Sequence, residues 1–467
     1  MGRTIFEKIW DRHLVEDLGN GTGLVLIDRV LLHERTGGVA LQSLESAGRP
    51  VASPGQVFAT MDHVVDTLPG RTDRTIMPTG TAFITATRAA ARAAGITLFD
   101  LGDPRQGIVH VISPEQAIVL PGLTLVCPDS HTCSQGALGA LAWGIGSSEA
   151  EHALATTTLR VKRPRTMRIT VDGALAPGVT AKDLALHLLM RFGSSGAKGH
   201  VVEYAGDAVR ALDVEGRLTL CNMATELAAF TAIIAPDETV FAYLDGRPYA
   251  PRGAMWEQAL ADWTTLGSDA DAVFDADCRV DAACVAPMVT WGTSPQQAVP
   301  LGRAVPSFAE VSGWDTAEAH ARALDYMGLG EGEGIVGAPI DAAFIGSCTN
   351  ARLSDLRRAA AILKGRHVAA GVRAICVPGS GAVKAAAEAE GLDRIFLDAG
   401  FEWREPGCSM CFFAGGESFG ARERVITSTN RNFASRQGPG TRSHLASPET
   451  VAASAIAGRI AGAGSVA

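Results

Sequence analysis

Two stretches of the sequence decide the fold: Phe344-Ile-Gly-Ser-Cys-Thr-Asn350 and Glu405-Pro-Gly-Cys-Ser-Met-Cys411. They contain Cys348, Cys408 and Cys411, which form a lone cysteine plus a C-x-x-C pair. A fully protein-ligated iron–sulfur cubane takes four thiolates, so a cubane held by these three would keep one iron without a protein ligand. Such an iron can bind substrate and act as a Lewis acid. The spacing by itself also fits a redox-active C-x-x-C pair or half of a structural zinc site.

Further motifs occur at several places in the chain: Cys127-Pro-Asp-Ser-His-Thr132, Gly144-Ile-Gly-Ser-Ser-Glu149, Leu353-Ser-Asp-Leu-Arg357, and Ser428-Thr-Asn-Arg-Asn-Phe433 followed by Arg436-Gln-Gly-Pro-Gly440. Together with the two cysteine-containing stretches they resemble the aconitase superfamily. Within it the chain is most similar to the large subunits of isopropylmalate dehydratases, and the resemblance runs from Lys8 to the C-terminus.

The resemblance implies an α/β fold of the aconitase type. Three layered α/β/α domains are expected around an iron–sulfur cluster, without the fourth, swivelling domain of full-length aconitases. Polar or Pro/Gly-rich segments at 160–166 and 292–305 mark the junctions between domains. The predicted domains are therefore residues 1–165, 166–292 and 293–467.

The resemblance also implies one [4Fe-4S] cluster per chain, held by Cys348, Cys408 and Cys411, with one iron lacking a protein ligand. Small residues beside these cysteines leave room for an inorganic core, since Gly346 precedes the first motif's cysteine and Gly407 the second's. Amides near the cluster sulfurs would tune its reduction potential.

Dehydration of a hydroxy-diacid requires protonation of a poor leaving group and removal of a weakly acidic C–H proton, so the site needs tuned acid–base groups. By resemblance to the family these groups form three pairs of a histidine with a carboxylate. The predicted pairs are Asp62 with His63, His110 with Asp129, and His131 with Glu226. A neighbouring carboxylate raises the pKa of an imidazole and fixes its tautomer. Any one of these histidines alone would more often be a surface or core residue.

The substrate's carboxylates need cationic or polar donors, and arginine suits them because its planar guanidinium binds a carboxylate through two hydrogen bonds. The positions that the family uses for substrate and for the cluster surroundings are here His33, Ser130, Asn430, Arg431 and Arg436.

The predicted function is that of the large subunit of a [4Fe-4S]-dependent hydro-lyase, which interconverts 2-isopropylmalate and 3-isopropylmalate through a dehydrated intermediate in leucine biosynthesis. The two-chain branch of the superfamily implies a separate small subunit that carries the swivelling domain and completes the site. The expected substrate is a small hydroxy-diacid.

Alternative substrates fit the same chemistry: citramalate, homocitrate, maleate or a larger 3-substituted malate. They stay open because Phe412-Phe-Ala-Gly-Gly-Glu-Ser-Phe419 differs from the aliphatic stretch usual after the family's C-x-x-C, and because Cys133 stands where a small hydroxyl residue is more common. An alternative of another class is an RNA-binding regulator in its cluster-free form. The net charge of −9 and the lack of Lys/Arg runs argue against it.

Composition sets independent bounds. A chain of 467 residues that is 47% hydrophobic can bury two or three cores, since single cores stop growing at roughly 250–300 residues. No apolar stretch reaches about 18 residues and the N-terminus has no apolar leader, so we expect no membrane segment and a cytoplasmic protein. Nine cysteines argue against a disulfide framework. We expect six of them to be small buried hydrophobes: Cys127, Cys133, Cys221, Cys278, Cys284 and Cys376.

Alternating short β-branched runs and Ala-rich amphipathic stretches predict α/β layering. The predicted strands are 109–112, 118–120, 167–171, 343–345 and 374–377. The predicted helices are 81–94, 149–159, 181–191, 353–363 and 383–390.

Overall fold

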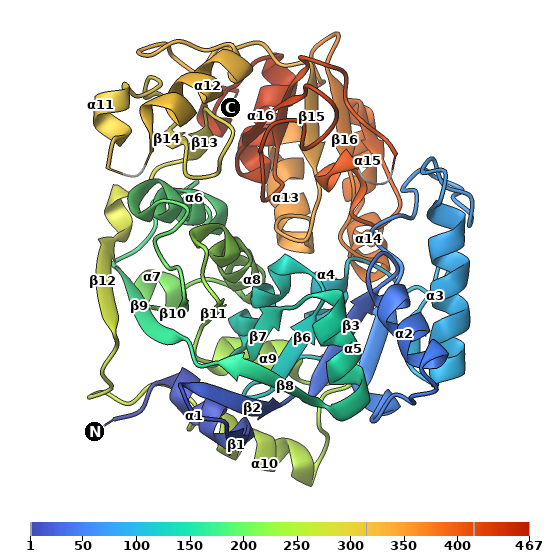
Figure 1. Ribbon diagram of the computed structural model, residues 1–467. Helices are drawn as coiled ribbons and strands as arrows, with labels where there is room; N and C mark the ends of the chain where they lie inside the picture. The colour runs from blue at the N-terminus through green and yellow to red at the C-terminus, as the bar shows by residue number, and fades with distance from the viewer. Residues whose placement is uncertain (1, 314, 414–415, 467) are drawn as a thin grey trace. The chain divides into compact units, whose positions relative to one another are not determined.

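The structure is a computed structural model that describes residues 2–313, 315–413 and 416–466 (Figure 1). The chain divides into two compact units. The first comprises Met1–Asp62, Thr81–Ala174 and Ala197–Asp281, and the second comprises His63–Gly80, Leu175–Gly196 and Ala282–Ala467. The division into three domains stays a prediction.

The first unit is built on a five-stranded parallel sheet in the order β5-β4-β3-β6-β7. Its strands are β3 Arg29–His33, β4 Val57–Thr60, β5 Thr97–Phe99, β6 Thr124–Cys127 and β7 Leu141–Gly144. Strands β4 and β6 are buried throughout, as is typical of parallel strands covered on both faces. From β3 the chain adds β4 and β5 on one side and later β6 and β7 on the other. The order therefore reverses between β3 and β6, and ligands of open α/β sheets commonly bind at such a point, at the carboxyl ends of the strands.

Two smaller sheets complete this unit. One is antiparallel with the order β1-β2-β8, and the other is parallel with the order β11-β10-β9-β12. Their strands are β1 Leu14–Asp17, β2 Thr22–Leu26, β8 Thr158–Lys162, β9 Arg165–Asp172, β10 His200–Ala205, β11 Thr231–Ile233 and β12 Ala276–Asp281. The helices of the unit are α1 Ile5–His13, α2 Gly37–Ser46, α3 Gly80–Ala94, α4 Val109–Glu115, α5 Ser147–Thr156, α7 Asp207–Arg210, α8 Val214–Asn222, α9 Glu238–Leu244 and α10 Ala254–Trp263.

The second unit repeats the strand pattern of the first. Its five parallel strands run in the order β17-β16-β15-β18-β19. They are β15 Ala342–Ile345, β16 Arg373–Cys376, β17 Phe401–Trp403, β18 Arg424–Thr427 and β19 Arg442–Leu445. The order reverses between β15 and β18, which are the strands that precede Cys348 and Asn430.

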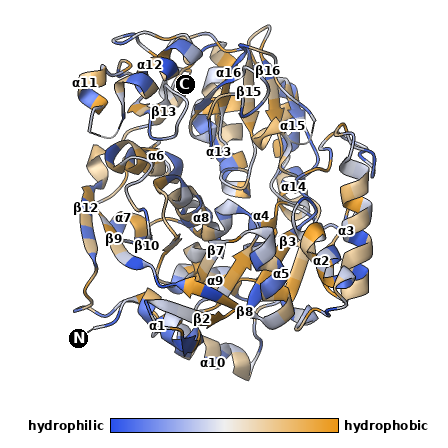
Figure 2. Ribbon diagram, viewed as in Figure 1, coloured by the Kyte–Doolittle hydropathy of each residue, from blue (hydrophilic) through white to orange (hydrophobic). Residues whose placement is uncertain are grey.

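The helices of the second unit are α6 Ala181–Phe192, α11 Phe308–Val311, α12 Ala317–Met327, α13 Leu353–Leu363, α14 Gly381–Ala389, α15 Leu392–Ala399 and α16 Pro448–Ala457. An antiparallel pair, β13 Met288–Thr290 and β14 Ala298–Pro300, also belongs here. Orange, hydrophobic colour follows the central strands in Figure 2, as expected of strands with helices packed on them. α16 contacts both β15 and β18.

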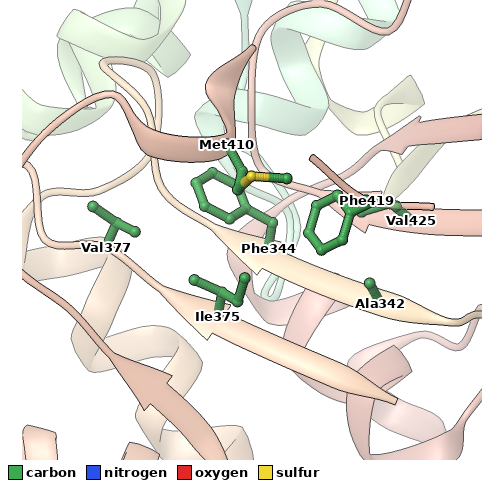
Figure 3. Close-up of a cluster of buried hydrophobic side chains, with 7 residues drawn as sticks. All are labelled: Ala342, Phe344, Ile375, Val377, Met410, Phe419 and Val425. Carbon is green, nitrogen blue, oxygen red and sulfur yellow. The ribbon is translucent and has the colours of Figure 1, made fainter. Parts of the chain in front are cut away.

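A hydrophobic cluster lies on the central strands of the second sheet, and Figure 3 shows Met410 reaching into it over Phe344. Its members are Ala342, Phe344, Ile375, Val377, Met410, Phe419 and Val425. Met410 is fully buried although it lies in the loop between Cys408 and Cys411. The cysteine loop is therefore anchored in the core.

The α/β fold predicted from the sequence is confirmed, and so are the five predicted helices and three of the five predicted strands. The strands predicted at 109–112 and 118–120 are wrong. The first lies in helix α4 and the second lies outside any strand. A short apolar run that is buried on all sides shows no periodicity, so sequence alone could not tell a buried helical turn from a strand.

No helix in the described part of the chain is long and apolar enough to cross a membrane. Four of the six remaining cysteines are buried as expected, but Cys278 is only half-buried and Cys284 is exposed, so the expectation is wrong for these two. Cys278 lies in the edge strand β12 and Cys284 follows it, and residues at a sheet edge are covered by fewer neighbours.

Candidate functional site

The first group of candidate residues lies where the strand order of the first sheet reverses. His33 ends β3, and Asp129 to His131 follow β6. The two segments meet directly, since the Nε2 atom of His33 lies 3.3 Å from the carbonyl oxygen of Pro128. Thr36 donates to the same carbonyl.

Four titratable side chains form two hydrogen-bonded pairs in this group. His110 Nε2 lies 3.0 Å from Asp129 Oδ1, and His131 Nε2 lies 3.2 Å from Glu226 Oε1. The backbone N–H of His131 donates to the same Asp129 oxygen at 2.8 Å, because Asp129 is the N-cap of the 3-10 helix Ser130–Leu138. Two of the three predicted pairs are thus in hydrogen-bond distance, and the backbone of His131 links them through Asp129.

Asp62 sets the start of the helix that carries His110. Its Oδ2 atom accepts a hydrogen bond from the backbone N–H of Val109, the first residue of α4, at 2.9 Å. A carboxylate at a helix N-terminus is stabilised by the unpaired N–H groups and the dipole there. The backbone N–H of Asp62 in turn donates to Glu34 Oε2 at 3.0 Å.

Glu34 is a candidate that the sequence analysis missed. It is fully buried, and its carboxylate, that of Asp62 and the imidazole of His33 have ligand atoms within 4.8 Å of one another. A signal was present in the sequence, because Glu34 directly follows His33 in Leu32-His-Glu-Arg-Thr36. A lone Glu after a strand is usually exposed to solvent, so the sequence alone does not single out Glu34.

The side chain of Cys133 is turned into the protein. Its Sγ donates to the backbone carbonyl of Asn222 at 3.6 Å, and it is 2% exposed. Ser130, by contrast, is exposed, and its Oγ lies 3.4 Å from His131 Nδ1. Cys133 therefore packs inside the protein under the segment Ser130–Leu138, whereas Ser130 lies beside the predicted acid–base histidine His131.

The second group lies at the corresponding reversal of the second sheet. Cys348 follows β15, and the loop with Cys408 and Cys411 follows β17. All three are buried, between 6% and 8% exposed. Gly346 is required by close approach, since an ideal Cβ there would lie 2.5 Å from the Phe344 ring. Ser347 has φ +86°, so the chain turns sharply just before Cys348.

Asn430 brings two of the cysteines together. Its Nδ2 donates to Cys348 Sγ at 3.5 Å, and Cys411 Sγ donates to its Oδ1 at 4.0 Å. Arg436 Nη2 lies 3.9 Å from Cys411 Sγ, and the backbone N–H of Cys411 donates to the Cys408 carbonyl at 3.0 Å. Contacts thus connect side chains from three loops, namely Cys348, Cys411, Asn430 and Arg436.

Three contacts hold the C-x-x-C loop. Met410 is buried in the core, and its carbonyl accepts a hydrogen bond from Gln437 Nε2 at 2.7 Å. Thr67 Oγ1 donates to Ser409 Oγ at 2.9 Å, which ties the loop to the segment His63–Gly80 of the same unit. Arg404, 1% exposed, pairs with Glu417 at 2.6 Å across the loop.

The aconitase family model, described as aconitate hydratase, matches residues 7–458. The chain belongs to the aconitase family. The family predicted from the motifs is thereby confirmed.

The chain is 52% identical, over 460 residues, to the 3-isopropylmalate dehydratase large subunit 1 of Bradyrhizobium diazoefficiens. That alignment covers 98% of this chain and 96% of the relative. A crystal structure of Thermococcus kodakaraensis aconitase X in its holo-form is also similar, with a TM-score of 0.46 and 15% identity over 88% of this chain and 84% of that one. A likeness at that distance carries no argument about the site.

Membership of the aconitase family implies an iron–sulfur cluster, and the second group of residues fits one. All three thiols are buried, two of them contact one asparagine amide, and a guanidinium lies beside Cys411. Thiolates are the ligands of iron–sulfur clusters, and N–H donors near their sulfurs are the usual surroundings. Family membership therefore favours a cluster over the redox C-x-x-C pair and the zinc half-site that spacing alone left open.

Phe412, a departure from the common family pattern, lies between two predicted site residues. Its ring is edge-on to His63 with centroids 5.9 Å apart, and the Arg436 guanidinium lies 4.9 Å from its centre. The same guanidinium lies 5.0 Å from the ring of Phe433. Arg436 is thus held between two aromatic rings, a geometry that attracts cations.

The remaining departures and predicted residues lie nearby in the second unit. Phe413 is 45% exposed, and residues 414–415 of the departing stretch lie outside the described residues. Arg431 is half-buried and is flanked by the buried Asn430 and Asn432. Asn432 fixes this segment, because its amide donates to the Gly292 carbonyl at 2.7 Å.

Proposed function

We propose that the protein is the large subunit of a [4Fe-4S]-dependent hydro-lyase that interconverts 2-isopropylmalate and 3-isopropylmalate through a dehydrated intermediate. The reaction class is that of the aconitase family, to which the chain belongs. The observation that carries the substrate is the 52% identity, over 98% of the chain, to a protein named 3-isopropylmalate dehydratase large subunit.

In this proposal Cys348, Cys408 and Cys411 hold one cluster per chain, with one iron that lacks a protein ligand. When bound, the cluster supplies a Lewis acid for the hydroxyl and one carboxylate of the substrate. Asn430 donates a hydrogen bond to the sulfur of Cys348, and Arg436 donates one to the sulfur of Cys411. These donors partly offset the negative charge of the two thiolates.

The two histidine–carboxylate pairs hold and transfer protons. The Asp129 carboxylate pairs with the His110 ring and thereby fixes the tautomer and orientation of that ring, and it also accepts from the backbone N–H of His131. Glu226 fixes the ring of His131 through its Nε2 atom. An imidazole with a carboxylate behind it can give a proton to a leaving hydroxyl and recover it from water.

His63 with Asp62 is assigned to protonation of the leaving hydroxyl. The backbone at this point is fixed on both sides, since Asp62 accepts from Val109 and its own N–H donates to Glu34. Arg431 and Arg436 orient the substrate's carboxylates, and His33 and Ser130 contact its polar groups.

The partner is a separate small subunit that carries the swivelling domain, and both subunits act in the cytoplasm. The relative's name, which includes the words large subunit, supports a second chain. The base that removes the C–H proton is assigned to that subunit, so we expect the chain described here to turn over little substrate alone.

The test is anaerobic reconstitution of the chain with its small subunit, followed by the absorbance of the unsaturated product formed from 3-isopropylmalate and from a panel of other malates. Turnover of isopropylmalate with the highest kcat/KM of the panel supports the proposal. A wild-type chain that binds no iron and sulfide under these conditions contradicts it.

A related hydroxy-diacid is the second candidate, and Phe412 is the observation that favours it. A phenyl ring beside both His63 and Arg436 occupies space that an aliphatic residue usually takes in the family. Preference for another malate in the panel would keep the reaction and change the substrate.

A further inference from the structure

Lys182 is a fully buried lysine behind the cysteine loops of the second unit. It lies in the first turn of α6, which begins at a capping box formed by Thr180 and Asp183. Its Nζ donates to the carbonyl of Ser428 at 2.8 Å and to that of Thr429 at 2.5 Å. A third, longer contact of 3.4 Å reaches Asn350 Oδ1.

Burial of an ammonium group is costly unless an opposite charge pairs with it. Among the described residues Lys182 forms no ion pair. The neighbouring carboxylate of Asp183 is engaged elsewhere, since it accepts from the N–H of Met288 at 2.8 Å and from Thr180 at 2.9 Å. Burial lowers the pKa of Lys182 to about 7, although Asp355, Asp183 and the thiols of Cys348 and Cys411 oppose the shift. The fold therefore holds a charge that the protein groups nearby compensate poorly.

The acceptors of Lys182 lead directly to the cysteines. Ser428 and Thr429 precede Asn430, whose amide contacts Cys348 and Cys411. Asn350 lies two residues after Cys348 in the other loop, and Asp355 accepts from its Nδ2 at 3.1 Å, which points its oxygen toward Lys182. One ammonium group thus links the two loops that follow β15 and β18.

A second buried cation, Arg352, lies in the loop that carries Cys348. Arg352 is 2% exposed, and its Nη1 donates to the Thr349 carbonyl at 3.0 Å. Its Nε and Nη2 atoms have no hydrogen-bond partner among the described residues. Buried donors are nearly always satisfied in native proteins, so the surroundings of Cys348 carry more positive charge and more donors than the protein itself uses.

We propose that Lys182 is a positioning residue for the cluster, which ties the Asn430 segment to the Cys348 loop and supplies positive charge to the cluster and its three thiolates. The inference rests on the proposed role of Cys348, Cys408 and Cys411. The inference extends that proposed role, because it explains why a lysine is buried here although its hydrogen bonds go to Asn350, Ser428 and Thr429 and not to the thiols. A cluster with three thiolates carries net negative charge, and a buried cation several ångströms away stabilises it more strongly than it would in water.

The test compares Lys182→Gln, Lys182→Met and Lys182→Arg with the wild-type chain. Glutamine keeps N–H donors but has no charge. Methionine has neither the donors nor the charge, and arginine keeps the positive charge. Lys364→Gln is the matched control, since Lys364 is an exposed lysine of the same unit. After anaerobic reconstitution we would measure iron and sulfide per chain, the rate of cluster loss to a chelator, the reduction potential of the cluster, and the thermal unfolding of the cluster-free chains.

We expect Lys182→Gln and Lys182→Met to lose the cluster about tenfold faster than wild type, the lower end of what outer-shell substitutions cost a metal site. We expect a lower reduction potential in Lys182→Gln, because loss of a nearby positive charge favours the oxidised cluster. The cluster-free Lys182→Gln chain should unfold at the wild-type temperature or above, since the uncompensated charge is gone. Lys364→Gln should match wild type in every measurement.

A purely structural lysine would give a different pattern. Lys182→Gln would then keep the wild-type potential and rate of cluster loss, or its cluster-free form would lose as much thermal stability as the loaded form, and either result overturns the inference. Failure of the proposed function looks different again, because the wild-type chain would then assemble no cluster at all.

Discussion

The two five-stranded sheets of the protein have the same strand order, yet they present different chemistry at the point where that order reverses. In the first, β3 and β6 lead to histidines and carboxylates, with His110 and His131 linked through Asp129. In the second, β15 and β18 lead to Cys348 and Asn430. The topology gives both sheets the same reversal point, and the residues of the loops decide which chemistry is available there.

The two groups also differ in what holds them. The titratable group is fixed by hydrogen bonds, such as that from Val109 to Asp62. The thiol group has hydrogen bonds too, but it is also fixed by packing of Met410 in the core and by the buried charge of Lys182. Proton transfer needs groups whose partners define a tautomer, whereas cluster ligands need a rigid frame of fixed width. Each group should therefore respond to substitution in its own way.

The largest expected effect comes from loss of a cysteine ligand in the thiol group. Cys348→Ser should lose the cluster and all activity above background, because the remaining two thiolates cannot hold a cubane. Iron and sulfide analysis after reconstitution measures this directly. Cys284→Ser, at an exposed cysteine, is the control and should retain both. Full cluster content in Cys348→Ser would remove the ligand assignment.

His131→Ala should affect activity without affecting the cluster. We expect kcat to fall by about 10²–10⁴-fold, the usual contribution of a general acid or base, with unchanged iron content and visible spectrum. Steady-state kinetics with the small subunit present measure the fall. A change in KM alone would show that His131 binds substrate and does not transfer protons.

Met410→Ala should show how far the thiol group depends on packing. Removal of this buried side chain should lower the free energy of unfolding by about 2–5 kcal/mol and speed up cluster loss, since the C-x-x-C loop loses its anchor. Chemical denaturation of the cluster-free chain gives the first quantity. Met255→Ala is the matched control, because Met255 is 68% exposed and should change stability by less than about 0.5 kcal/mol.

Phe412→Leu should change the choice of substrate more than the rate on the best one. A leucine leaves more space beside His63 and Arg436, so the ratio of kcat/KM values between a larger and a smaller 3-substituted malate should rise about tenfold. The malate panel measures that ratio. An unchanged ratio would place the phenyl ring away from the substrate's side chain.

The smallest effect concerns the stability of the first unit, where His13 Nε2 lies 2.7 Å from Asp28 Oδ2. Burial lowers the pKa of His13, but the hydrogen bonds to Asp28 and to the Ile9 carbonyl outweigh it, so the net pKa is raised above 6.5. Burial likewise raises the pKa of Asp28, and the bond to His13 more than reverses this. The His13 contribution is full below its unfolded pKa of 6.5 and is lost as pH rises through the folded value.

His13→Gln should therefore cost about 1.5 kcal/mol of unfolding free energy near pH 5.5, as expected for a hydrogen bond between charged groups, and less near pH 9. At still lower pH the cost should shrink again, because Asp28 is protonated as pH falls through its lowered pKa. Denaturation at three pH values tests the sign. A cost that grows between pH 5.5 and 9 would contradict it.

Sequence motifs single out candidate reactive residues, because thiol, imidazole and carboxylate groups at special positions are rare and their neighbours are characteristic; the roles of these residues stay predictions. They predicted the supporting residues poorly. Glu34 and Met410 are ordinary residues in the sequence, and only burial and contact show what they do. The same limit explains the misassigned strand at 109–112, whose apolar residues form the helix that begins at the Asp62 carboxylate.

The sequence by itself determined the family and most of the alternation of helices and strands, and it named the candidate thiols and histidine–carboxylate pairs, since these depend on residue types and local order. The tertiary structure alone decided that both sheets reverse at β3–β6 and at β15–β18, and that Lys182 reaches carbonyls 246 and 247 positions away. Such contacts follow from how strands are ordered and which buried charge needs acceptors. No local pattern in a chain records either of these.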